Sequence, residues 1–498
     1  MAALQLAATA GCPLVFACCE GTFMPSISNF VEIPLVTRYL RSMATRAVPL
    51  ALAIGLTITA YQPAFAQSSE SDDFNPLAVN VETLPARKSL TATGAQLDEL
   101  VALALQQNPR LAQIGYGVQA ARGRAHQAGL YPNPTVSLTW DELGDKTGPS
   151  GVNTLPLVTQ EIVTGRKLKI SRAAGLREVD RNTADLMAER YSLLANVRSA
   201  YFDALALQAR TVILRKSVQM ADKSVNQTNK LLNAKEVARL DLVQLEVEAE
   251  RLRTDLEATE RELPSAYKRL AAIVGVHGLE IHQVDGALDA PLPEYDLDRT
   301  QQYVLSVHPE LQAAQFSVER ARLLLQRAKV EPIPNISVNA GYVRQNQNRS
   351  DDYTLGASVS IPLWNRNQGN IRAADAELCA AMQEVQRVEN SLADGVALAM
   401  RDFASAKRRT ERYHTAIIPR ATETYELSLL AYQGGQFEYL RVLEAQRTLA
   451  QANIEYIRAL GEAWKAAATI SGFTLEEQWP PATVEVPPAP DVPLREGE

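Results

Sequence analysis

Apolar residues recur with two different periods along the chain. Over 242–263, leucine and alanine stand mostly three or four residues apart, which is the heptad spacing of helices that pack along a seam. Over 336–342 and 353–363, apolar residues instead alternate with small polar ones, as in strands with one apolar and one polar face. The first pattern predicts long packed helices, and the second predicts a sheet with one face in an apolar environment.

These patterns predict the same order of elements in each half of the chain. Pro132 and Pro134 end the first helix of the first half, while Pro264 and Pro419 are expected to kink or break the helices that contain them. The predicted helices are 97–130, 166–233 and 240–272 in the first half and 301–330, 365–433 and 437–472 in the second; the predicted strands are 134–141, 155–163, 335–344 and 353–363.

Short motifs recur at a constant separation of 200 residues. Asn-Pro-Arg-Leu at 108–111 returns as His-Pro-Glu-Leu at 308–311, and Pro-Asn-Pro at 132–134 returns as Pro-Ile-Pro at 332–334. This period is far longer than a solenoid unit of roughly 20–50 residues, so it indicates duplication of a half-molecule. The predicted organisation is a signal peptide at 1–66, a linker at 67–96, a first repeat at 97–275, an inter-repeat equatorial segment at 276–300, a second repeat at 301–472, and a Pro-rich disordered tail at 473–498.

The N-terminus reads as an export signal. Arg46 precedes an apolar run over 47–60, and Ala64-Phe65-Ala66 is a small-x-small cleavage site. We therefore expect translation to start at Met43, with a weaker lipoprotein-like box ending at Cys18 as the alternative. Three of the four cysteines precede the cleavage site, so the mature chain would keep only Cys379 and no internal disulfide.

The strand pattern predicts a membrane barrel built by several copies. Segments of about ten residues with an apolar and a small-polar face are typical of a barrel wall, and a sheet packed on a helix is the alternative. Four strands cannot close a barrel with a lumen, and open edges in lipid leave backbone groups without partners. The protein should therefore be an oligomer whose copies complete one barrel.

Composition narrows the function classes further. Hydrophobic residues make up 46% and aromatic residues 6%, which favours extended helix packing, and the net charge of −7 argues against a nucleic-acid-binding surface. The five histidines are scattered, and no Ser/His/Asp set, phosphate loop or carboxylate pair stands out. We predict that the protein is not an enzyme and carries neither a cofactor nor a metal site.

Several motifs together resemble the TolC-like outer-membrane factors, over about 97–472. The duplicated Asn-Pro/His-Pro and Pro-x-Pro pairs carry the resemblance, and Thr159–Ile162 resembles the heavy-metal branch, of cobalt–zinc–cadmium (CzcC-like) and copper–silver types. Further matching segments are Gln160–Ile162 with Gly165–Lys167, Arg239–Asp241, Tyr432–Gly435 and Val442–Gln446.

The resemblance implies a fold and a set of partners. The fold is mainly α with β: a long α-helical coiled-coil barrel continuous with a trimeric twelve-stranded transmembrane β-barrel, four strands per protomer. The implied function is the passive exit duct of a tripartite efflux system, in the Gram-negative outer membrane with its helical tunnel in the periplasm. The implied partners are two further copies, a periplasmic adaptor, an inner-membrane RND transporter and membrane lipid.

The resemblance also places the candidate site at two helix–turn–helix tips. The tips are expected to dock the adaptor, where Gly434 and Gly435 can supply the positive φ of a tight turn and Lys235 stands where the family usually has glycine. An Asp241–Arg441 pair could latch neighbouring hairpins; a solvated helix face is the alternative. The adaptor-docking residues are Ala234, Lys235, Glu236, Val237, Gly434, Gly435, Gln436 and Phe437, and the candidate periplasmic gate is Asp241, Tyr432, Arg441 and Glu444.

The sequence leaves several classes of exported cargo possible. The heavy-metal resemblance favours metal cations, which an acidic lumen would attract by steering alone. Export of drugs or of proteins through a type I system is a second possibility. A soluble periplasmic coiled-coil adaptor or scaffold is an alternative of a different class, although an adaptor should have a single hairpin between split β domains.

Overall fold

The computed structural model describes residues 91–92, 94–141, 152–235, 237–346, 349–434 and 439–479, all within the unit Arg87–Glu498. The predicted signal peptide, most of the linker 67–96 and the tail from Pro480 lie outside the described residues. So do four of the candidate tip residues, Glu236, Gly435, Gln436 and Phe437.

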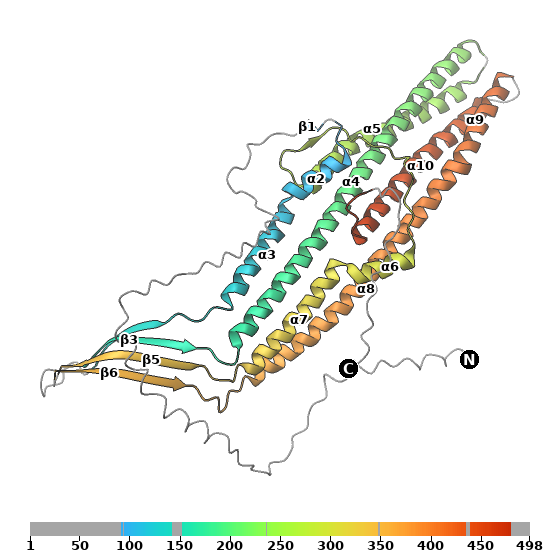
Figure 1. Ribbon diagram of the computed structural model, residues 1–498. Coiled ribbons are helices and arrows are strands. Elements are labelled where there is room, and N and C mark those ends of the chain that lie inside the picture. The colour runs from blue at the N-terminus through green and yellow to red at the C-terminus, as the bar shows by residue number, and fades with distance from the viewer. Residues whose placement is uncertain are drawn as a thin grey trace, which may run out of the picture. The chain divides into compact units, whose positions relative to one another are not determined.

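Helices make up most of the described chain, and their order repeats (Figure 1). A π-helical turn at Tyr413–Ile417 separates α8 from α9 next to Pro419, whereas α5 continues through Pro264. Within the described residues, no helix combines the length and apolarity that crossing a membrane requires. The helices are α2 Leu97–Gln107, α3 Pro109–Gln127, α4 Lys167–Asn233, α5 Arg239–Val274, α6 Leu297–Val307, α7 Pro309–Val330, α8 Gln368–Arg412, α9 Ile418–Gln433 and α10 Tyr439–Phe473.

The first helix of each half is broken where the sequence predicts one continuous helix. The breaks fall at Asn108 and His308, each in extended backbone directly before a proline. A proline disfavours helical backbone at the preceding residue but fits the first helical position, so the motif ends one helix and begins the next. The predictions 97–130 and 301–330 were therefore wrong in continuity, and α6 begins earlier, at Leu297.

Four antiparallel strands form one sheet in the order β2-β3-β5-β6 (Figure 1). The last strand is shifted from its predicted position and ends at Val359, which pairs with Ile336 at the start of β5. A second sheet pairs β1 Thr91–Ala92 with β4 Glu280–Ile281 in parallel. The strands of the larger sheet are β2 Thr135–Asp141, β3 Val152–Ile162, β5 Ile336–Gln345 and β6 Ser350–Val359.

The two faces of the four-stranded sheet differ in chemistry, as the alternation predicts. Ala340 pairs with Leu355 and Tyr342 with Tyr353, so apolar residues lie beside apolar residues across β5 and β6. The next positions pair Ser337 with Ser358 and Asn339 with Gly356 on the other face. Tyr353 and Leu355 are 87% and 80% exposed, so no described residue covers the apolar face at these two positions.

The largest core lies where α4 and α10 meet the segment between α5 and α6. Phe202 stacks on Trp464 with ring centroids 4.8 Å apart, and the Trp464 indole Nε1 donates to the Leu288 carbonyl over 2.8 Å. The Tyr201 hydroxyl donates to the Asp285 carbonyl, and burial raises the pKa of Tyr201 to about 12, so it remains a neutral donor. The connecting segment is thus fixed to the helices at several points.

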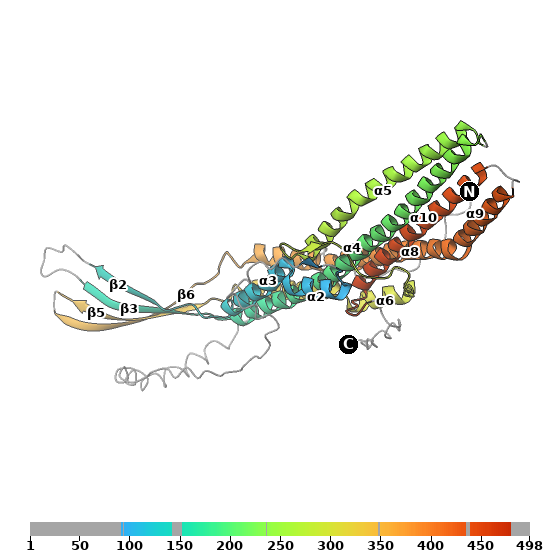
Figure 2. The same cartoon turned by 90° about the horizontal axis from the view of Figure 1, so that it is seen from above.

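Four helices lie side by side toward the two turns, in the order α5, α4, α10, α9 (Figure 2). The long helix α4 packs against both α5 and α10, and α9 packs against α10. Helices α5 and α9 therefore form the two edges of this layer. The two turns, which carry the candidate site, join α4 to α5 and α9 to α10.

Candidate functional site at the two helical tips

The first tip is a tight turn with a lysine in an unusual backbone conformation. Ala234 ends α4, and its N–H donates to the Lys230 carbonyl. Lys235 follows with φ +63°, and its N–H donates to the Leu232 carbonyl over 2.9 Å. The left-handed region costs a non-glycine residue about 1 kcal/mol. Lys235 thus adopts the backbone conformation that a glycine would take without that cost.

Asp241 stabilises the first tip from within its own hairpin. It is the third residue of α5, and its Oδ2 accepts the N–H of Ala238 over 3.1 Å. A carboxylate here also interacts favourably with the positive end of the helix dipole. Among the described residues, no ion pair joins Asp241 to Arg441 within one chain. A latch between neighbouring hairpins, as the sequence suggests, stays a prediction.

The second tip holds the other candidate gate residues. Gly434 ends α9 with φ −80°, so it does not use the positive φ that the sequence analysis assigned to it. Tyr432 is half-buried and lines a cavity of about 640 Å³ together with Lys230, Leu231 and Gln446. Leu231 and Tyr432 each lie close to a turn, and both line this cavity. The ends of the two hairpins therefore lie at the same level along the helices.

Arg441 and Glu444 lie on the first turns of α10 and are both exposed. The Glu444 backbone carbonyl accepts the hydroxyl of Thr448 over 2.8 Å. Within one chain the four candidate gate residues therefore divide between two hairpins: Asp241 begins α5, and the other three surround the second turn.

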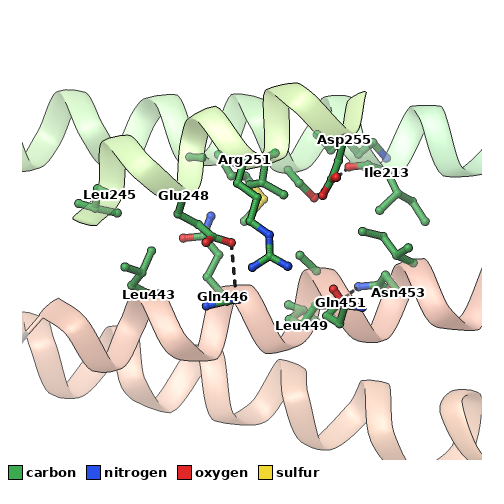
Figure 3. Close-up of a pocket in the computed structure, with 18 residues that line it drawn as sticks. Ile213, Leu245, Glu248, Arg251, Asp255, Leu443, Gln446, Leu449, Gln451 and Asn453 are labelled. Atoms are coloured by element: carbon green, nitrogen blue, oxygen red, sulfur yellow. Dashed lines mark hydrogen bonds and ion pairs between the residues drawn. The ribbon is translucent and has the colours of Figure 1, made fainter. Parts of the chain in front are cut away.

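A second cavity between the hairpins was not foreseen from the sequence (Figure 3). It measures about 320 Å³ and lies between α4, α5 and α10. Glu248 and Arg251 project toward it from α5, and Glu248 forms an ion pair with Arg447 of α10 over 3.6 Å. The Glu248 side chain is only 17% exposed, so this pair is better shielded than most of the others.

One signal in the sequence could have pointed to this ion pair. Glu248 stands between Leu245 and Ala249, both of which are buried, so the heptad pattern places a carboxylate beside an apolar seam. A charge in such a position needs a partner, which the tertiary structure supplies as Arg447. The pair links the first hairpin to the second.

The described residues at the two tips offer polar contacts and charged side chains. In the part of the chain that the structure describes, no group of three His, Cys, Asp or Glu side chains is placed to hold a metal ion. The described residues of the tips instead present exposed charged side chains at the ends of long helices, which are suited to contacts between proteins.

The model of the outer membrane efflux protein family matches residues 100–276 and 301–473. The chain belongs to this family. The resemblance that its motifs indicate is therefore confirmed, and so is the helix-rich class of fold with a few strands. The members of this family are channel proteins.

Individual relatives are similar over most of their length. The chain is 25% identical to the cobalt-zinc-cadmium resistance protein CzcC of Cupriavidus metallidurans, over 84% of this chain and 98% of that protein. It is 24% identical to the cation efflux system protein CusC of Escherichia coli O157:H7, over 71% of this chain and 80% of that protein.

Solved structures of outer-membrane channels share the fold. A crystal structure of CusC aligns with a TM-score of 0.63 and 20% identity, covering 76% of this chain and 92% of that one. The outer membrane protein VceC of Vibrio cholerae aligns with a TM-score of 0.63 and 18% identity, covering 76% of this chain and 95% of that one. At this identity the likeness concerns the fold alone.

Proposed function

We propose that this protein is the subunit of a trimeric outer-membrane duct that lets heavy-metal cations leave the cell. The observation that carries the proposal is the four-stranded sheet, whose apolar face is exposed and whose opposite face carries small polar residues. Such a sheet is stable when lipid covers the first face and water fills the space behind the second.

The edges of the sheet support assembly from several copies. Strands β2 and β6 are the edge strands, and each has a ladder partner on one side only among the described residues. In lipid, unpaired backbone groups cost several kcal/mol each, so the edges must meet other edges. Three copies that join β2 to β6 give a closed barrel of twelve strands with no free edge.

The helices provide the continuation of the duct. At about 1.5 Å per residue, the 67 residues of α4 extend about 100 Å, enough to line a periplasmic tunnel. The family model matches two segments of similar length, and the order of helices and strands repeats between them. Both facts support a duplicated subunit that contributes two equivalent sets of helices to the wall.

The similarity to CzcC and CusC supports metal cations as the cargo. A passive duct need not bind its cargo, and the net charge of −7 is of the sign that steers cations toward the bore. We place the duct in a tripartite system in which an inner-membrane RND transporter supplies the driving force. A periplasmic adaptor would dock on the turns at 234–237 and 434–437.

Metal tolerance tests this function. We expect deletion of the gene to lower the tolerated concentration of zinc, cobalt, cadmium or copper several-fold, with little effect on antibiotics. Plasmid-borne wild-type protein should restore tolerance, and a variant with Leu355→Asp on the lipid-facing side should fail to assemble and to restore it. Equal metal tolerance with lost antibiotic tolerance would identify a drug duct instead.

We further propose that Asp241, Tyr432, Arg441 and Glu444 gate the periplasmic end. Asp241→Asn removes the negative charge at the start of α5 and weakens the bond that the carboxylate accepts from the Ala238 N–H, and Glu444→Gln removes an exposed charge at the second tip. Single-channel conductance in planar bilayers should rise in either variant, because looser tips open more easily. Glu411→Gln, on an exposed position of α8 far from the tips, is the control. Unchanged conductance in both tip variants would contradict the gate.

A further inference from the structure

One carboxylate lies on the small-polar face of the four-stranded sheet, at the end nearest the helices. Glu161 pairs with Ser337 of β5, and Ser337 pairs with Ser358 of β6. Residues directly opposite each other in a ladder have their side chains on the same face, so Glu161 shares the face of the two serines. All three residues line one cavity of about 380 Å³. The Gln-Glu-Ile motif at 160–162 therefore carries a charge on this face.

The described residues that follow on this face are neutral until the outer end of the sheet. They include Thr159 and Asn339, which pair with each other. The next carboxylate on this face along β6 is Asp352, which lies six residues from Ser358, or about 20 Å away. Glu161 thus lies at the junction with the helices, since α4 begins only a few residues after it (Figure 1).

Two neighbouring side chains hold the Glu161 carboxylate in place. Asn335 Nδ2 donates to Glu161 Oε1 over 2.7 Å, and Asn335 Oδ1 accepts the Lys167 ammonium over 3.0 Å. Burial, and then the charge of Arg327, lower the pKa of Lys167, while the Glu161 charge acts in the opposite direction. Lys167 is only 3% exposed, whereas Glu161 is half-buried. Water on the polar face therefore meets the carboxylate rather than the ammonium.

The second half of the chain has no equivalent charge. The residue 200 positions after Glu161 is Ile361, which follows the end of β6. The residue 200 positions after Lys167 is Asn367. A ring of three copies would therefore carry one carboxylate per copy at this level, although it contains six copies of the repeat.

We infer that Glu161 forms a ring of three carboxylates at the inner mouth of the barrel, which favours the passage of cations over anions. The inference rests on the proposed trimeric duct and adds the residue that sets its charge preference. Rings of acidic side chains make a pore selective for cations by electrostatic attraction. The ring would act on hydrated cations as a class.

The dimensions of such a barrel allow three charges to act across the whole bore. Twelve strands about 4.8 Å apart and tilted by about 40° enclose a backbone radius of about 12 Å. Side chains occupy about 5 Å of this radius, half the distance between two packed sheets, which leaves about 7 Å. The Debye length at physiological ionic strength is about 8 Å, so the field of the ring reaches the centre of the bore. Carboxylates this far apart cannot share one ion, so the ring attracts cations without coordinating a metal.

The ratio of potassium to chloride permeability tests this inference. It is obtained from the reversal potential of the purified full-length protein in planar bilayers under a KCl gradient. All channels carry Asp241→Asn and Glu444→Gln, so that these acids at the tips do not contribute. In this background we expect Glu161→Gln to lower the ratio at least threefold, because glutamine keeps an acceptor for Asn335 but not the charge. Glu161→Asp keeps the charge and should largely preserve the ratio.

Asp351→Asn is the matched control. Asp351 precedes Asp352 in β6 but pairs with Arg344 on the apolar face of the sheet, outside the bore. The same change of charge on that face should leave the permeability ratio unaltered. An equal fall in the control would attribute the effect to the overall charge of the protein and overturn the inference.

Salt provides a readout that a purely structural role of Glu161 would not alter. The Debye length falls from about 10 Å at 0.1 M to about 3 Å at 1 M. The difference in permeability ratio between the parent channel and Glu161→Gln should therefore shrink by at least half in solutions near 1 M. A difference that is independent of salt would contradict an electrostatic ring.

Two further outcomes separate this inference from the proposed function. Conducting trimers whose permeability ratio is unchanged in Glu161→Gln would refute the ring and leave the duct intact. Purified protein that forms no trimer and conducts no ions would refute both.

Discussion

The two halves of the chain perform the same structural task at positions 108 and 308 with different side chains. Asn108 accepts the N–H groups of Arg110 and Leu111 over 2.9 and 3.3 Å, and its amide donates to the carbonyls of Ile273 and Val274. Among the described residues, His308 accepts only the N–H of Glu310, through Nδ1 over 3.3 Å. Its ring instead lies beside Phe473, with ring centroids 6.3 Å apart.

This difference shows that the two positions share backbone geometry rather than side-chain chemistry. In both halves a capping residue precedes a proline and lies near the end of the last helix of that half, α5 or α10. The first half fixes this junction with hydrogen bonds, and the second fixes it with ring packing. The second half alone thereby acquires a titratable group in a buried junction.

A second contrast lies at positions 264 and 464. Pro264 is exposed within α5, while Trp464 is fully buried in α10 and donates to the Leu288 carbonyl. The second half therefore anchors the connecting segment, and the first half has no equivalent at this position.

The largest effect is expected from Trp464→Ala. Loss of a fully buried indole and of its hydrogen bond should lower the free energy of unfolding by about 3–5 kcal/mol. Thermal unfolding of the detergent-solubilised protein, followed by circular dichroism, measures this loss. Pro264→Ala is the control at the equivalent position and should leave stability unchanged or raise it. Equal losses of stability in Trp464→Ala and Pro264→Ala would contradict the difference between the two halves at this position.

Acid should destabilise the second half through His308. Burial lowers the pKa of His308 to about 4, so the unfolded chain, with a pKa of about 6.5, binds a proton that the folded chain excludes. Stability is then complete above about pH 6.5 and falls as the pH drops toward 4, by up to about 3 kcal/mol. Unfolding measured at a series of pH values should show this slope.

The matched variant for this test is His308→Asn, which copies the first half. It keeps an acceptor for the Glu310 N–H but cannot titrate, so the slope between pH 6.5 and 4 should become shallower. An unchanged slope would mean that other groups cause the acid sensitivity.

Asn108→Ala should have a smaller effect in the first half. The change removes the cap of α3 and both hydrogen bonds to the end of α5, at a cost of about 1–2 kcal/mol. Asn108→Ser retains a capping oxygen but not the amide donor, so it should lose less stability than Asn108→Ala. A loss for serine equal to that for alanine would show that the link to α5, and not the cap, dominates.

The smallest effect is expected at the first tip. Lys235→Gly relieves the left-handed backbone at φ +63° but increases the conformational freedom of the unfolded chain. We therefore expect the free energy of unfolding to rise by less than about 1 kcal/mol. Lys235→Ala keeps the strain and is the control. Hydrogen exchange of the backbone amides around the turn measures this change in local stability. Greater protection in Lys235→Ala than in Lys235→Gly would contradict the prediction.

Much of the architecture was predictable because it depends on local sequence. The helices α4 and α10 and the strands β2 and β5 agree closely with their predicted ranges, since heptad and alternating patterns act within each element. The breaks at Asn108 and His308 were missed although the motif was noticed, because the repeat was compared without considering how proline restricts its neighbour.

The candidate site was less predictable. The sequence identified both turns, but it gave no means to see that Asp241 accepts the N–H of Ala238 or that Gly434 has a negative φ. The Glu248–Arg447 ion pair joins residues on different hairpins, so neither side chain reveals its partner from local spacing.

The sequence alone determined the periodicities, and with them the type and order of the main helices and strands and the two faces of the sheet. These properties follow from how side chains repeat along one element, which involves only nearby residues. Only the tertiary structure decided that α5 and α9 form the edges of the tip layer and that apolar residues such as Val247 and Leu430 remain exposed there. Those facts depend on contacts between residues far apart in the chain, which no local pattern encodes.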